Sequence, residues 1–248
     1  MAHILSEIGW HAAQLEGGYR AYRRDILAQL AVLPQKFRYR VVCGATGSAK
    51  SRLLQALAAA GAQVLDLEDL ASHRGSVLGN LPEEPQPAQK MFDSLVWDAL
   101  RKFDPAKCVY VEAESKKIGQ LQVPDALLAR MRASPCVLIE APLAERVAFL
   151  VREYGHFLGD PQDLKAKLDC LAGLHSKETL ARWMSQVEHG EWDELVADLL
   201  ANHYDPAYRR ATLRNFEQLA HAEMLRPAQL DATSLARLAA QLIAGEQA

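Results

Sequence analysis

Residues 44–51 have the types and the order of a phosphate-binding loop. The segment reads Gly44-Ala45-Thr46-Gly47-Ser48-Ala49-Lys50-Ser51, follows an apolar run and opens a helical stretch. In such a loop, backbone N–H groups and the positive end of the next helix surround phosphate oxygens, the lysine adds charge and the serine binds magnesium. The sequence therefore predicts an anion site with Ser51 as a metal ligand. Its predicted members are Gly44, Thr46, Gly47, Ser48, Lys50 and Ser51.

One position departs from the usual loop pattern. Ala49 stands directly before the lysine, where the pattern has glycine because the backbone lies close to phosphate there. A methyl group at this point would weaken or abolish phosphate binding if it intrudes. In that case we expect Ala49→Gly to tighten the binding of a diphosphate.

Charged residues also follow the later apolar runs, at the edge where ligands collect in open parallel sheets. Glu112, Glu114 and Lys116 follow one run, and Glu140 follows another, with Arg146 about a helical turn further on. Carboxylates opposite a phosphate-loop serine commonly hold magnesium, and a cation there neutralises charge on a diphosphate. We favour function over helix capping for Glu112 and Glu114, and leave both open for Glu140.

The stretch 66–79, DLEDLASHRGSVLG, combines a histidine, an arginine and two glycines. Such a run is a poor strand and a poor helix, so we expect its residues to meet a ligand. Arg74 can present a bidentate fork to phosphate, and His73 can exchange a proton near neutral pH. A lone histidine in a loop is also commonly a solvated surface residue.

Residues 203–210, HYDPAYRR, join two helical segments further along the chain. Pro206 suits the first turn of a helix, with Asp205 as its cap. The tyrosines and the paired arginines could instead stack on bases and bind phosphates.

The elements that must position these residues alternate between short β-type runs and helical runs from residue 38 onward, as in parallel α/β folds. Candidate strands cover 39–43, 63–66, 107–112 and 136–140, and candidate helices cover about 51–60, 86–102, 125–132 and 143–154. The strands are nearly continuous apolar runs, as expected when helices cover both faces of a sheet. Beyond residue 159 the pattern predicts helices only, and Asp231 or Ser234 caps the last of them before Gly245 ends it. The predicted fold is a three-layer α/β parallel-sheet P-loop NTPase domain of kinase-like type, with an α-helical C-terminal region.

Composition narrows the class of protein further. The chain has 248 residues with 50% hydrophobic content, enough for a full core. No apolar stretch approaches the roughly 18 to 20 uncharged residues of a membrane span, and the N-terminus lacks a signal-peptide pattern, so we expect no membrane partner and a cytoplasmic location. The cysteines lack zinc-type spacing, and we interpret Cys43, Cys108 and Cys136 as buried hydrophobic residues.

Charge is distributed unevenly along the chain. Residues 1–60 hold eight basic and three acidic residues, although the net charge of the whole chain is −3. A positive side suits a polyanionic partner bound near the phosphate loop, whereas the simpler interpretation is a solvated basic helix and linker.

From about residue 9 to about residue 210 the chain resembles the P-loop domain of bacterial tRNA 2-selenouridine synthases. The resemblance rests on the GxTGxxKS loop, DLEDLASHRGSVLG, Gln86 and Gln89 before Phe92, VEAESKKIG with Pro124, IEAPLAERVAFLVREYG and HYDPAYRR, in that order. The combination of DLE, HRGS and ESxxIG is far more specific than a phosphate loop alone.

The resemblance implies a transferase that modifies 2-thiouridine at the anticodon wobble position of tRNA. Members replace sulfur by selenium from selenophosphate, and the base passes through an S-geranylated intermediate made from geranyl diphosphate. The roles it implies, with Mg²⁺ as cofactor, are diphosphate binding by the phosphate loop, charge neutralisation by Arg74 and Lys116, metal binding by Ser51 and Glu112, and catalysis by Glu114, His73 and Arg74.

Family members also carry a rhodanese-like domain whose cysteine is linked to selenium transfer. Residues 1–35 resemble only the tail of that domain, so we divide the chain into 1–35, a P-loop domain over 36–160 and a helical region over 161–248. We expect selenium exchange to need a cysteine from a separate rhodanese-type or selenium-donor protein, or from a missing N-terminal portion. The alternatives are a P-loop nucleotide or small-molecule kinase and a catalytically inactive tRNA-binding module.

Overall fold

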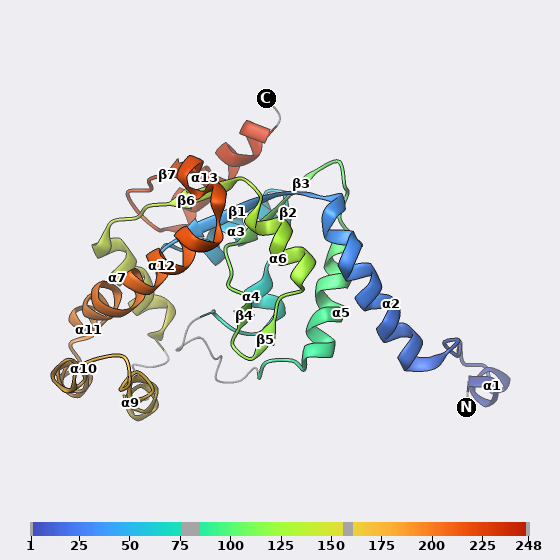
Figure 1. Cartoon of the computed structure of the whole chain (residues 1–248), viewed down its shortest axis with the longest axis horizontal. Helices are drawn as coiled ribbons and strands as arrows, with labels where there is room; N and C mark the ends of the chain where they lie inside the picture. Colours follow the sequence, from blue (N-terminus) through green and yellow to red (C-terminus); the bar gives the residue numbers. More distant parts are fainter. Residues whose placement is uncertain (1, 76–84, 156–160, 247–248) are drawn as a thin grey trace.

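The computed structural model describes residues 2–75, 85–155 and 161–246. Its centre is a five-stranded sheet in the order β2-β3-β1-β6-β7, in which every neighbouring pair is parallel. The strands are β1 (Arg38–Gly44), β2 (Gln63–Leu65), β3 (Cys108–Glu112), β6 (Cys136–Ile139) and β7 (Glu223–Leu225). Because β1 lies in the middle of the sheet, the loop that follows it leaves from the centre of the carboxyl edge (Figure 1).

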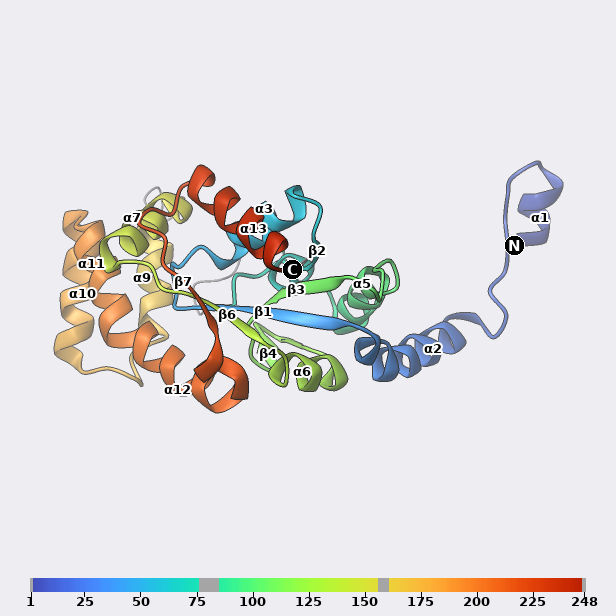
Figure 2. The same ribbon diagram turned by 90° about the horizontal axis from the view of Figure 1, so that it is seen from above.

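Helices cover both faces of this sheet, which confirms the predicted three-layer α/β fold (Figure 2). Successive residues of β1 alternate between the faces, since Val41 and Cys43 belong to one buried cluster and Val42 to the other. The first cluster includes residues of α2 (Gly18–Val32), α5 (Gln89–Leu100) and α6 (Asp125–Arg132). The second includes residues of α3 (Lys50–Ala59) and α13 (Ala232–Glu246).

The helical C-terminal region lies beyond the carboxyl edge of the sheet (Figures 1 and 2). It contains α9 (Pro161–Asp169), α10 (Lys177–His189), α11 (Trp192–Leu199), the π-helical turn η2 (Leu200–Tyr204), α12 (Asp205–Asn215) and the 3₁₀ turn η3 (Glu217–His221), next to α7 (Leu143–Glu153). Its own core includes Trp183, Val187 and Leu195, as the helical spacing of these residues predicts.

The remaining described elements are short. They are α1 (Ala2–Glu7), the 3₁₀ turn η1 (Leu33–Lys36), α4 (Leu67–Leu70) and the two-stranded hairpin of β4 (Lys117–Ile118) and β5 (Leu121–Gln122). The helix α1 buries none of its residues and projects away from the body (Figure 2). Within the described ranges, no helix is long and apolar enough to cross a membrane.

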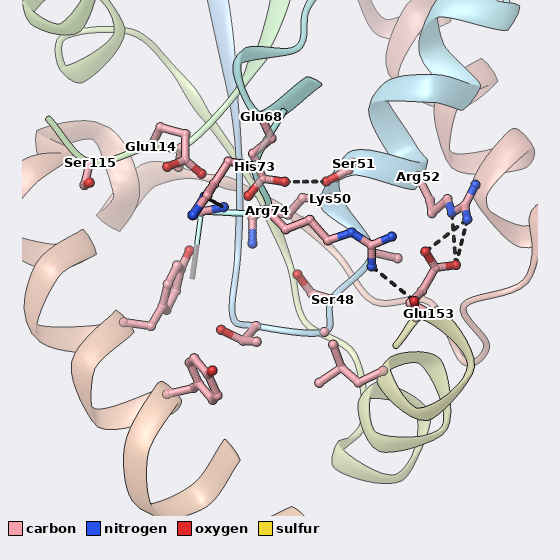
Figure 3. A pocket seen from close by; sticks show the side chains of 18 of the residues that line it. Ser48, Lys50, Ser51, Arg52, Glu68, His73, Arg74, Glu114, Ser115 and Glu153 are labelled. Atoms are coloured by element: carbon pink, nitrogen blue, oxygen red, sulfur yellow. Dashed lines mark hydrogen bonds and ion pairs between the residues drawn. The ribbon is translucent and has the colours of Figure 1, made fainter. Parts of the chain in front are cut away.

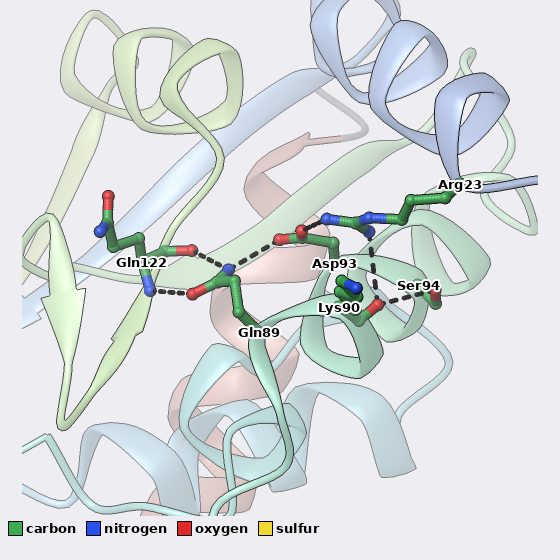
Figure 4. A network of polar contacts seen from close by, with 6 residues as sticks. All are labelled: Arg23, Gln89, Lys90, Asp93, Ser94 and Gln122. Carbon is green, nitrogen blue, oxygen red and sulfur yellow. Dashed lines mark hydrogen bonds and ion pairs between the residues drawn. The ribbon is translucent and has the colours of Figure 1, made fainter. Parts of the chain in front are cut away.

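Two glutamines tie the hairpin to its surroundings. Gln89 exchanges two hydrogen bonds with the backbone of Gln122 and also donates to Asp93, which pairs with Arg23 of α2 (Figure 4). Gln86 donates to the carbonyl of Ile118 and accepts from the N–H of residue 120. The paired glutamines of the sequence therefore have a structural role.

Three details of the sequence prediction are wrong. The strand β7 overturns the expectation of helices only in the last third of the chain. Gly245 lies inside α13 rather than beyond its end. Asp205 caps no helix, since Tyr204 occupies that position before α12. Asp231 does accept a hydrogen bond from the N–H of Ser234, as predicted. The proposed boundary at residue 160 lies outside the described residues.

Candidate phosphate-binding and acid–base site

The predicted phosphate loop connects β1 to α3 and lines a cavity of about 560 Å³ at the carboxyl edge. Gly47 has φ +81°, and a Cβ there would come within 2.9 Å of Leu150 and 3.1 Å of the Arg146 carbonyl. Glycine is therefore required at this point. Ala49 also has a left-handed backbone, with φ 61° and ψ 33°, so alanine occupies a conformation that favours glycine.

Ala49, the residue that departs from the usual loop pattern, is among the residues that line the cavity. Ala49 is only 4% exposed and belongs to the buried apolar cluster that contains Leu53 and Val42. The loop therefore keeps the glycine-type backbone, and its extra methyl group is almost fully buried.

The two side chains that end the loop have internal partners. Lys50 donates from Nζ to the carbonyl of Gly44 at 2.8 Å, and Ser51 donates from Oγ to Glu68 Oε2 at 2.9 Å. Lys50 and Glu68 point into the same hollow (Figure 3). The loop thus places a cation and a hydroxyl–carboxylate pair on one side of the cavity.

Carboxylates gather on the adjoining side. Glu114 is 8% exposed and lines the cavity, and burial together with the charge of Glu68 raises its pKa to about 8. Burial raises the pKa of Glu112 well above its ordinary value, and it raises the pKa of Asp66 to about 6. A carboxyl group that titrates near neutral pH can act as a general acid or base, which makes Glu114 the best placed group of this kind in the cavity.

His73 and Arg74 both line the cavity, as the sequence predicts for ligand contact. His73 is 6% exposed, and its Nδ1 accepts a hydrogen bond from the N–H of Gly75 at 3.0 Å. Arg74 donates to the carbonyl of Glu153 at 3.2 Å and lies 4.9 Å from the ring centroid of Tyr154. The last part of the predicted segment, residues 76–79, lies outside the described residues.

Several other predicted residues do not line the cavity, and one of them is Gly44, whose N–H donates to the hydroxyl of Tyr208. Lys116 directly precedes the hairpin of β4 and β5, and its Nζ pairs with Asp125 at 3.1 Å. Glu112 lies behind the cavity wall, where its Oε1 accepts a hydrogen bond from the N–H of Glu68. Glu140 pairs with Arg226 on the surface. The geometry therefore does not bring Lys116 and Glu112 to the predicted ligand site.

Arg146 of α7 connects the phosphate loop to α12 through hydrogen bonds. Its Nε donates to the carbonyl of Thr46 at 2.9 Å, and its two terminal nitrogens bind the carboxylate of Asp205 at 2.6 and 3.0 Å. Arg146 is 7% exposed, so this is a largely buried ion pair. It explains the position of Asp205, which the sequence assigned to a helix cap.

Sequence reasoning did not predict the apolar wall of the cavity or the hydrogen bond between Glu68 and Ser51. Phe149 and Leu150 of α7 form this wall with Tyr204 and Tyr208 from the C-terminal region. The hydroxyl of Tyr208 accepts a hydrogen bond from the N–H of Gly44 at 2.7 Å. The tyrosines stood out in the sequence, but no local pattern signals a contact between residues 164 positions apart. The position of Glu68 after the second strand was the available signal for that residue.

The oxygen ligands at the site suit Mg²⁺ that is also bound by water and substrate phosphate better than a metal ion bound by protein side chains alone. The described residues contain no group of three or more His, Cys, Asp or Glu side chains arranged to hold a metal. Magnesium commonly uses one or two protein ligands together with water and substrate phosphates. Ser51 and Glu68 could supply such ligands, whereas Glu112 does not reach the cavity. Two buried atoms near the site, Ser48 Oγ and Glu112 Oε2, lack hydrogen-bond partners among the described residues.

Comparison with known proteins identifies the family. Residues 37–175, more than half of the chain, match the model of the tRNA 2-selenouridine synthase AAA domain. The tRNA 2-selenouridine synthase of Alcanivorax borkumensis is 31% identical over 82% of this chain and 63% of that protein. The synthase of Shewanella sediminis is 34% identical over 83% of this chain and 62% of its own length. The chain thus spans just under two thirds of the length of these relatives. It belongs to the tRNA 2-selenouridine synthase AAA-domain family.

Proposed function

We propose that this chain is the P-loop part of a tRNA 2-selenouridine synthase and that it transfers a geranyl group from geranyl diphosphate to wobble 2-thiouridine of tRNA. One observation carries the proposal. The loop with the phosphate-binding sequence pattern and Lys50 line the same cavity as the apolar side chains of Phe149 and Leu150, and Leu150 lies close to the loop at Gly47. Such a site suits a ligand with a diphosphate head and a hydrocarbon chain, because each part meets matching chemistry.

The loop would bind the diphosphate and stabilise it as a leaving group. Its N–H groups and the N-terminus of α3 would surround the phosphate oxygens, and Lys50 would turn from the Gly44 carbonyl to meet them. Ser51 and Glu68 would hold Mg²⁺, which when bound supplies further charge neutralisation to the diphosphate. Arg74, at the rim of the same cavity, would add a second cation.

In the transfer, the bond between the allylic carbon and the diphosphate oxygen breaks and a carbon–sulfur bond forms at the 2-thio group. The base then loses its N3 proton, and pyrophosphate leaves. Glu114 would accept this proton, because a carboxyl group with a pKa of about 8 exists in both protonation states near neutral pH. His73, buried beside Glu114 in the cavity lining, is the second candidate for proton transfer.

In this proposal, exchange of sulfur for selenium uses a thiol from outside the cavity, in a rhodanese-type domain or another selenium-donor protein. A hydrogen bond with Cys136 and burial raise the pKa of Cys43, and burial raises the pKa of Cys108 to about 11. The same contact lowers the pKa of Cys136, but Cys136 is buried, and none of these three thiols is among the residues that line the cavity. Cys170 is exposed but lies in the helical region, away from the cavity lining. Selenium from selenophosphate would therefore arrive through a rhodanese-type domain or another selenium-donor protein.

The test is mass spectrometry of an anticodon stem–loop RNA that carries 2-thiouridine, incubated with the protein, Mg²⁺ and geranyl diphosphate. We expect a geranylated RNA with the parent chain and none with Lys50→Ala. Turnover of ATP with no response to geranyl diphosphate would instead support a P-loop kinase. RNA binding without any product, unchanged by Lys50→Ala, would support an inactive RNA-binding module.

A further inference from the structure

The helix α12 is connected to the phosphate loop by hydrogen bonds at two points. At the first, the hydroxyl of Tyr208 accepts the N–H of Gly44, where β1 ends. At the second, Asp205 holds Arg146, which donates to the carbonyl of Thr46. The conformation of the loop therefore depends on the position of a helix that is more than 150 residues away along the chain.

The opposite face of α12 carries free positive charge. Arg210 and Arg214 are exposed, and neither makes an ion pair within the part of the chain that the structure describes. At 3.6 residues per turn, Arg210 and Arg214 lie one turn apart on the side of the helix that faces away from Tyr208 and Asp205. Guanidinium groups spaced in this way suit the phosphates of a nucleic-acid backbone.

We propose that α12 couples RNA binding to diphosphate binding: its outer arginines bind RNA phosphates, and its inner residues then hold the phosphate loop in its binding conformation. This inference rests on the proposed function, which supplies RNA as the polyanion. A π-helical turn, η2, directly precedes α12, and such turns mark places where a helix departs from regular geometry. When bound RNA holds α12 in place, the entropy cost of ordering α12 and the loop is already met, so a diphosphate binds more tightly.

The coupling is reciprocal and favours a definite order of events. Each ligand raises the affinity for the other by the same factor, as linkage requires. A reactive allylic diphosphate is then held most firmly when the acceptor RNA is already bound. The loop contact of Tyr208 transmits the effect, so Tyr208 acts as a positioning residue that needs no contact with the RNA.

The test measures the dissociation constant of pyrophosphate by calorimetry, with Mg²⁺, in the absence and presence of a saturating anticodon stem–loop RNA that lacks the thio group. The parent chain should bind pyrophosphate about fivefold or more tightly with RNA present. Tyr208→Phe keeps the ring and removes the hydroxyl, so it should bind RNA as the parent does and lose most of this difference.

Two double variants separate the proposed surface from general charge. R210E/R214E should weaken RNA binding by about tenfold or more and reduce its salt slope by about two. The matched control R20E/R24E changes two exposed arginines one turn apart on α2, at the far end of the molecule from α12 (Figure 2). It should retain RNA affinity and coupling.

The outcomes distinguish this inference from the proposed function. If the parent binds RNA and pyrophosphate but each without effect on the other, the coupling is refuted while the function stands. If R20E/R24E loses RNA affinity and R210E/R214E keeps it, α12 is the wrong surface. A parent chain that binds no RNA at all overturns both proposals.

Discussion

Replacement of Ala49 by glycine tests how this unusual phosphate loop works. Ala49 has φ 61° and ψ 33°, a left-handed conformation that costs a non-glycine residue about 1–2 kcal/mol. Glycine would adopt it without that cost. The sequence led to a separate expectation, that Ala49→Gly tightens the binding of a diphosphate if the methyl group intrudes.

The burial of the methyl group offsets this gain. Ala49 is 4% exposed within an apolar cluster, and removal of one buried methyl costs about 0.8 kcal/mol. Glycine also increases the freedom of the unfolded chain, which costs about 0.4–1 kcal/mol. The terms nearly cancel, so we expect the free energy of unfolding of Ala49→Gly to lie within about 1 kcal/mol of the parent value.

The same geometry predicts a small effect on ligand binding. Because the loop already has the glycine-type backbone and Ala49 is almost fully buried, pyrophosphate affinity should change by less than about threefold, or roughly 0.7 kcal/mol. Urea denaturation and calorimetric titration of both forms measure the two quantities. A tenfold tighter complex with Ala49→Gly would show that the methyl group does intrude on the phosphate, and would refute this reasoning.

Three further predictions concern the groups around the loop. The pKa of Glu114 in the folded state is raised to about 8, so the folded state binds this proton more tightly than the unfolded state does. The free energy of unfolding should therefore fall as the pH rises from about 4.5 to 8. Urea denaturation of the metal-free protein measures this fall, which should be smaller for Glu114→Gln. Ser51→Ala should lose the Mg²⁺-dependent part of pyrophosphate affinity in calorimetry while affinity in EDTA stays the same, and an equal loss under both conditions would contradict a metal role. Arg146→Met should lower the unfolding free energy by about 3 kcal/mol, because it leaves a partly buried carboxylate unpaired, whereas the exposed control Arg226→Met should cost less than about 1 kcal/mol.

The sequence was sufficient for the parts of the fold that local pattern encodes. Strands buried on both faces appear as continuous apolar runs, so β1, β2, β3 and β6 were all predicted, with ends within one residue of those observed. The strand β7 has only three residues and forms through its pairing with β6. It is too short to show a periodic pattern of apolar residues in the sequence.

The site was predictable only where function follows directly from the loop or a strand end. Lys50, Ser51 and Glu114 line the cavity as expected. Lys116 does not, because it directly precedes the short strand β4 and pairs with Asp125 at the start of α6. The contact of Tyr208 with the loop depends on how the C-terminal helices fold back on the sheet, which the spacing of residues along the sequence does not encode.

Calorimetric titration of pyrophosphate in the presence of Mg²⁺ tests most directly whether the loop is an anion site. The parent chain should bind pyrophosphate. Lys50→Ala should lose at least about tenfold in affinity because a charge-assisted contact disappears. Lys116→Ala should match the parent, because that lysine pairs with Asp125 outside the cavity. Absence of binding by the parent, or equal losses for the two lysine variants, would contradict a diphosphate site at this loop.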